Sequence, residues 1–76
     1  MGKNIENRNI LDSIAKIIRD ERKYQGLSQT ELAQLAGVSL NFISQLENGK
    51  PTVRLDKVDD VLKTLGLQMK VEYRNQ

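Results

Sequence analysis

The chain has 76 residues and a formal net charge of +2, and it contains neither cysteine nor histidine. This length fits one domain. The missing thiols and imidazoles exclude disulfides, the commonest metal ligands and the usual general base. No glycine-rich phosphate loop is present, and no apolar stretch approaches the roughly 18 residues of a membrane span. We therefore expect a domain that is not an enzyme, needs no cofactor or metal, and lies in the cytoplasm.

The first part of the chain is polar and then becomes amphipathic. Residues 1–8 are expected to form a flexible arm. Asn9 can cap a first helix, which should end near Gln25 with Gly26 as its C-terminal stop. Apolar residues recur on one arc of this helix at helical spacing: Ile10, Leu11, Ile14, Ala15, Ile17 and Ile18.

One cation interrupts the apolar side of this helix. Arg22 continues the row that Leu11, Ala15 and Ile18 form on the core side of the helix. Its guanidinium should therefore point at least partly towards the protein. A buried guanidinium needs a carboxylate partner, and Glu47 is the candidate. The alternative is that both side chains are solvated.

The segment 26–50 organises the rest of the chain. Ser28–Glu31 fits a capping box, which starts a short helix directly after the serine. Gly37 lies where that helix should end in the left-handed conformation that glycine adopts most easily. Ser39 caps a second short helix, and Gly49 stops it. Two short helices joined by a tight turn with glycine indicate a helix-turn-helix.

The spacing of this segment resembles the helix-turn-helix of the lambdoid-repressor class, also called the XRE family. Ala33 lies where the two helices must approach closely, and further apolar residues fill the interior: Leu32, Ala36, Val38, Ile43 and Leu46. The resemblance implies an all-α DNA-binding domain of four to five helices over residues 9–67. The alternative is an ordinary helical hairpin that shares the pattern.

In such a motif the second helix enters the major groove of DNA and presents its early residues to base edges. We therefore expect base contacts from Ser39, Leu40, Asn41, Ser44 and Gln45. Amide side chains can give adenine both a donor and an acceptor, and serine can serve either role. Leu40 departs from the lambdoid repressors, several of which carry a glutamine there. It could contact a thymine methyl group or face a protein neighbour.

Four residues around this helix are expected to contact phosphates. Gln29 lies at a helix N-terminus, where free backbone N–H groups favour an anion, and in the family the matching glutamine binds a phosphate. Asn48, Lys50 and Arg54 follow the second helix, where the family's loop touches the DNA backbone. The alternative for Lys50 and Arg54 is that both are solvated charges. A protein bound to DNA in this way would be associated with the nucleoid.

A last helix is expected after Pro51, beginning at Thr52 or Arg54 and ending at Gly66. Its apolar residues recur at helical spacing: Leu55, Val58, Val61, Leu62 and Leu65. Three aspartates near its start could suggest a cation site: Asp56, Asp59 and Asp60. Because no further ligand type converges on them, they are better explained as carboxylates in the early turns of a helix.

After Leu67 the apolar residues alternate with polar ones, which is a strand pattern. We expect residues 68–76 to be a dimerisation strand and tail, built around Met69, Lys70, Val71, Glu72 and Tyr73. No other segment reads as a strand, so its pairing partner must come from another molecule. A two-fold homodimer would place identical segments antiparallel, with the apolar side chains facing the helices. The alternative is a tail that stays disordered until a partner binds.

The strand that follows Leu65-Gly66-Leu67 looks like that of the HipB-type antitoxins, which pair such strands between two protomers. Those antitoxins bind a HipA-like kinase toxin and repress their own operon. The resemblance implies a homodimeric repressor with a toxin partner. Two alternatives stay open: a stand-alone repressor of the XRE family from a phage or chromosomal locus, and a protein-interaction module that has lost DNA binding.

Overall fold

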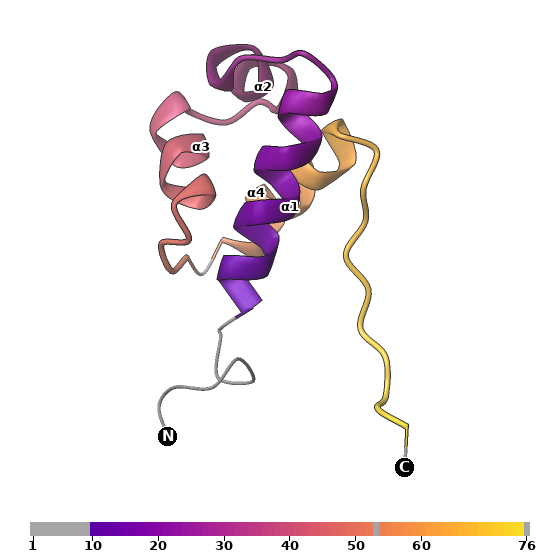
Figure 1. Cartoon of the computed structure of the whole chain (residues 1–76). Coiled ribbons are helices and arrows are strands. Elements are labelled where there is room, and N and C mark those ends of the chain that lie inside the picture. The colour runs from indigo at the N-terminus through magenta and orange to yellow at the C-terminus, as the bar shows by residue number, and fades with distance from the viewer. Residues whose placement is uncertain (1–9, 53, 76) are drawn as a thin grey trace, which may run out of the picture.

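The computed structural model describes residues 10–52 and 54–75, and within those ranges the chain forms four α-helices. They are α1 (Ile10–Tyr24), α2 (Gln29–Ala36), α3 (Leu40–Glu47) and α4 (Leu55–Thr64) (Figure 1). The predicted all-α class is thus observed with four helices. The expected arm, residues 1–8, and the expected cap Asn9 lie outside the described residues.

The helix ends follow the local sequence signals. Ser28 Oγ accepts the backbone N–H of Glu31 at 3.0 Å, and Glu31 Oε1 accepts that of Ser28 at 2.8 Å, which completes the predicted capping box of α2. The hydroxyl of Ser39 accepts the Phe42 N–H at 2.9 Å and caps α3. Gly37 ends α2 at a φ of 74°, the left-handed conformation that a residue with a Cβ adopts at a cost.

The turn after α3 lies next to Asp12 of α1. Gly49 has a φ of 74°, and a Cβ at this position would lie 2.8 Å from Oδ1 of Asp12 in α1. The left-handed φ is what favours glycine here, because the carboxylate of Asp12 is the end of a flexible side chain that can move away from a Cβ. Beyond this turn, α4 begins after Arg54, one of the two starts expected, and no side chain caps its N-terminus.

A single apolar core joins the helices and holds α3 in place. α2 packs on α3 and on α4, and α1 packs on α3. All four helices and the turn after α4 contribute buried residues to this core: Ile18, Leu32, Ala33, Ile43, Leu46, Val58, Val61, Leu62 and Leu65. α3 therefore has one face fixed in the core and the other left to solvent.

The segment after α4 leaves the domain. Residues 67–75 have no regular secondary structure, and they extend away from the helices (Figure 1). The expected packing of its apolar side chains on the helices is not met within one chain, because Val71 is 97% exposed and Tyr73 is 100% exposed. A strand needs a second strand to satisfy its N–H and C=O groups, and the described part of the chain contains no strand.

Candidate nucleic-acid interface

The outer face of α3 is polar and almost uncharged. Asn41 and Gln45 are exposed, as is Leu40 between them and the cap, whereas Ile43 and Leu46 on the inner face are buried. The only charged residue of α3 is Glu47, which is also buried. Solvent therefore meets amide groups and one leucine along the exposed side of this helix.

The two expected serine contacts are less available than the amides. Ser44 is only half-exposed. Ser39 is exposed, but its hydroxyl oxygen already accepts the Phe42 N–H, so what it has left to offer a base is its own O–H and a second lone pair. Of the five expected base-contacting residues, Asn41 and Gln45 are thus the freest.

A buried ion pair anchors the inner face of α3, as the break in the apolar row of the first helix predicts. Arg22 Nε donates to Glu47 Oε2 at 2.6 Å, and Arg22 Nη2 donates to Glu47 Oε1 at 2.9 Å. The remaining Nη1 of Arg22 donates to the backbone carbonyl of Leu27 at 2.9 Å. This two-point geometry ties the end of α3 to α1.

Glu47 also reaches α2. Gln29 Nε2 donates to Glu47 Oε1 at 3.0 Å. Burial acts to raise the pKa of the Glu47 carboxyl, but the hydrogen bonds from Arg22 and Gln29 and the nearby positive charges outweigh it, so the pKa lies below its usual value. The hydrogen bond to Glu47 raises the pKa of Arg22. The pair is therefore fully charged at neutral pH.

The four expected phosphate contacts differ in how free they are. Gln29 is half-buried, and since its amide carries two N–H groups, the bond to Glu47 leaves one N–H for another acceptor. Asn48 and Lys50 are exposed beside the end of α3. Arg54 instead forms two bonds to Asp56, at 3.0 and 2.8 Å, which lower the pKa of Asp56 to about 2. Exposed pairs of this kind are weak, so Arg54 can exchange Asp56 for a phosphate.

The three aspartates of α4 do not form a metal site in the part of the chain described, where no group of three or more potential ligands converges. Asp56 pairs with Arg54, and Asp59 pairs with Lys63 at 3.0 Å. None of the described helices is long and apolar enough to cross a bilayer.

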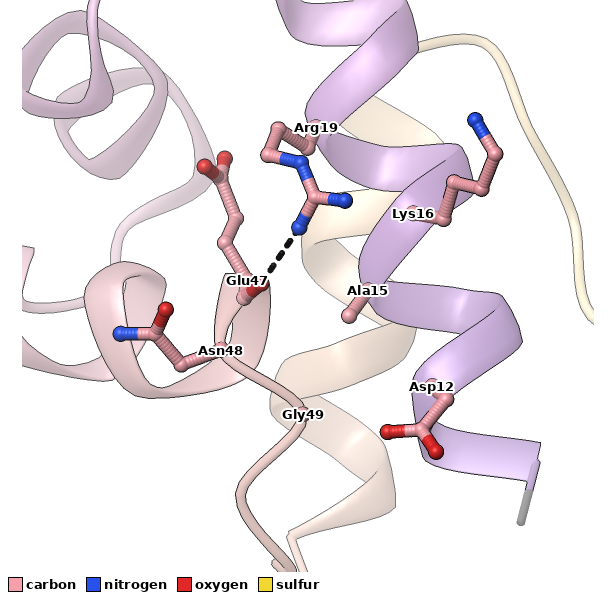
Figure 2. A pocket seen from close by; sticks show the side chains of 7 residues that line it. All are labelled: Asp12, Ala15, Lys16, Arg19, Glu47, Asn48 and Gly49. Carbon is pink, nitrogen blue, oxygen red and sulfur yellow. Dashed lines mark hydrogen bonds between the residues drawn. The ribbon is translucent and has the colours of Figure 1, made fainter. Parts of the chain in front are cut away.

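One contact of this region was missed by the sequence reasoning. Arg19 Nη1 donates at 2.8 Å to the backbone carbonyl of Glu47, at the C-terminus of α3 (Figure 2). A cation at this position also complements the helix dipole. Both bonded residues line a hollow of about 330 Å³ between α1 and the end of α3, together with Asp12, Ala15, Lys16, Asn48 and Gly49. Arg19 lies one helical turn before Arg22, but this spacing alone does not identify the Glu47 carbonyl as its partner.

The sequence matches known regulators over most of its length. The model of the helix-turn-helix family HTH_3 matches residues 18–70. An uncharacterized HTH-type transcriptional regulator of Sinorhizobium fredii, y4mF, is 50% identical over 58 residues, which are 76% of this chain and 76% of that protein.

Two solved structures have a similar fold. The clp gene regulator ClgR of Corynebacterium glutamicum superposes with a TM-score of 0.71 at 26% identity, over 80% of this chain and 65% of that one. A chain of a toxin-antitoxin module from Streptococcus pneumoniae superposes with a TM-score of 0.69 at 32% identity, over 97% of both chains. The first similarity covers a little under two thirds of its match, whereas the second extends over nearly the whole of both chains.

Proposed function

Because the chain belongs to the HTH_3 family of helix-turn-helix transcriptional regulators, we propose that it represses transcription by binding a specific operator in double-stranded DNA through α3. The observation that carries this proposal is that α3 has two different faces. Its inner face is buried in the core, and its outer face is uncharged and carries amide side chains. A helix presented in this way suits the major groove, where amides can read adenine.

Within this proposal Asn41 and Gln45 make the main base contacts, and Ser39 and Ser44 add shorter ones. Leu40, which is partly exposed, supplies an apolar contact suited to a thymine methyl group. An outer face without arginine or lysine favours A·T-rich half-sites, since the side chains that pair best with guanine are cationic.

Phosphate contacts on both sides would orient the helix in the groove. Gln29 offers its second amide N–H together with the free backbone N–H groups at the start of α2. Asn48, Lys50 and Arg54 supply contacts on the other side, after the end of α3. Together these four residues would provide most of the affinity that does not depend on base sequence.

We further propose that the protein acts as a homodimer and is the antitoxin of a HipA/HipB-like operon, at the nucleoid in the cytoplasm. In this role it represses its own promoter and neutralises a kinase toxin. The similarity to a chain of a toxin-antitoxin module supports this proposal, because it covers 97% of both chains and so includes nearly all of the tail.

In the proposed dimer the tails of two chains pair as an antiparallel ribbon around Met69, Lys70, Val71, Glu72 and Tyr73. Pairing would satisfy the backbone groups that one chain leaves open. Lys70 and Glu72, which pair at 3.1 Å within one chain, would then lie opposite each other across the ribbon. The ribbon would help to hold two recognition helices roughly 34–36 Å apart, the spacing of successive half-sites.

The test is binding to the DNA upstream of the protein's own reading frame, measured by footprinting and by fluorescence anisotropy. We expect protection of two half-sites by the dimer, and loss of protection in an Asn41→Ala, Gln45→Ala double variant that folds normally. Co-purification of the product of the neighbouring reading frame tests the antitoxin role. Specific binding at other promoters without a bound toxin would instead indicate a stand-alone repressor, and binding that never exceeds that to random DNA would refute both roles.

A further inference from the structure

A row of exposed apolar side chains runs along α1. Ile17 is 51% exposed and Tyr24 is 86% exposed, and Ile10 at the start of the helix is also largely exposed. These residues lie seven positions apart, which is close to two helical turns, so they share one side of the helix. The exposure of these side chains shows that no other described helix covers this side of α1, so the row is available for contact with another molecule.

The row faces away from the DNA-binding helix. Arg19 points to α3, where it donates to the Glu47 carbonyl. Ile17 lies about 200° around the helix from Arg19, and Tyr24 about 140°, at about 100° per residue. Both are therefore on the far side of α1 from α3. In Figure 1 the tail runs past α1 on the side opposite to α3.

The tail leaves the domain close to one end of this row. Gln25, just after α1, donates through Nε2 to the backbone carbonyl of Leu65 at 2.9 Å. From there the tail runs back in the direction of the start of α1 (Figure 1). It does not cover the row of its own chain, because Val71 and Tyr73 remain almost fully exposed.

We propose that the apolar row of α1 is the seat for the tail of a second copy of this chain. One chain carries an exposed apolar row on α1 and exposed apolar side chains in its tail, so a two-fold dimer in which each copy gives its tail and receives its partner's covers both. The lengths agree, since the row from residue 10 to 24 spans about 21 Å at 1.5 Å per residue. An extended segment over residues 67–75 spans about 26 Å at 3.3 Å per residue.

The chemistry of the tail fits the same occupant. Met69, Val71 and Tyr73 alternate with Lys70 and Glu72, so an extended tail has one apolar edge for the seat and one charged edge for water. The seat exists only in the proposed homodimer and therefore rests on that function. The seat adds to the proposed function the surface on which the ribbon would lie. Such a surface is needed because an isolated two-stranded ribbon is only marginally stable.

Cysteine cross-linking distinguishes the seat from the ribbon, because the chain has no cysteine of its own. An Ile17→Cys chain is mixed with a Tyr73→Cys chain of different tagged length and treated with a short bis-maleimide. We expect a cross-linked pair of unequal chains. Leu35→Cys replaces Ile17→Cys in the control, since Leu35 is 64% exposed on α2 and outside the seat. Absence of the Ile17–Tyr73 product, or equal yield with Leu35, would overturn the seat.

The ribbon is tested separately by Val71→Cys, which should cross-link to itself because Val71 lies opposite its own copy when Lys70 faces Glu72. A Val71 product without an Ile17 product leaves the ribbon and removes the seat, and the reverse result removes the ribbon. In the same full-length background, Ile17→Asp should weaken the dimer about tenfold or more, as expected for losing the burial of one isoleucine. Leu35→Asp should not, and an Ile17→Asp chain that dimerises like wild type contradicts the seat.

Discussion

Replacing Glu47 by alanine should remove at least about a quarter of the stability of this domain. The substitution leaves Arg22 buried with only the Leu27 carbonyl as a partner, and it removes the acceptor of Gln29. Breaking a buried pair by removing one partner costs about 3–5 kcal/mol. A chain of this size has about 4–11 kcal/mol of stability in total, at 0.05–0.15 kcal/mol per residue.

Thermal unfolding followed by circular dichroism measures this loss. At about 4–8 °C per kcal/mol for a small domain, the melting temperature should fall by at least about 12 °C. Glu72→Ala is the matched control, because Glu72 is an exposed glutamate paired with Lys70 in the tail. Equal melting temperatures for the two variants would refute the buried pair.

A second variant separates the loss of a pair from the loss of volume. Replacing both partners, Arg22→Met with Glu47→Leu, removes the two charges together and keeps apolar volume. Such exchanges are often neutral or stabilising, so the double variant should melt above Glu47→Ala. A double variant less stable than the single one would mean that Arg22 contributes mainly through its packing and its bond to Leu27.

The pair also predicts the response to acid. The folded pKa of Glu47 is lowered, so its contribution is complete above the unfolded value of 4.5 and is lost as the pH falls through the lower folded pKa. Glu47→Gln should therefore flatten the decrease of the unfolding free energy below pH 4.5, measured by urea titration. An unchanged slope would show that other carboxylates cause the decrease.

The remaining predictions concern DNA and assembly. Gln45→Ala should weaken operator binding by about 1–3 kcal/mol and leave binding to random DNA nearly unchanged, as measured by anisotropy with both ligands. Lys50→Ala should weaken both kinds of binding alike and reduce the slope of log affinity against log salt by about one unit; a loss limited to one operator base pair would contradict a phosphate contact. Deleting residues 68–76 should convert the dimer to a monomer in sedimentation and lower operator affinity, and a truncated chain that stays dimeric would exclude the ribbon as the main contact.

Much of the fold was predictable because its signals are local. The capping box at Ser28 and the cap at Ser39 act within one turn, so four or five letters of sequence are enough to place the starts of α2 and α3. The start of α4 was less certain, since Arg54 provides no capping hydrogen bond from its side chain. Arg22 was identified because it interrupts the core-facing apolar side of α1. A buried cation needs a partner wherever that partner lies in the sequence.

The rest depends on how helices approach each other. The bond from Arg19 to the Glu47 carbonyl needs the position of α3 relative to α1, and helical periodicity contains no such information. Likewise, the bond from Gln29 to Glu47 depends on three helices meeting at one carboxylate. In the proposed dimer the conformation of the tail would depend on a second molecule, which the sequence of one chain does not place.

The arrangement around α3 separates stability from recognition. Glu47 and the apolar inner face hold the helix from behind through α1 and α2, whereas Leu40, Asn41 and Gln45 contribute little to the core. In the proposed complex, changes on the outer face would therefore alter the preferred operator at small cost in folding, because exposed substitutions usually change stability by no more than about 0.5 kcal/mol. Gln29 is the exception, since one side chain is bonded to the buried carboxylate and also lies at the proposed phosphate contact. The proposed phosphate contact would thereby be coupled to the same ion pair that stabilises the fold.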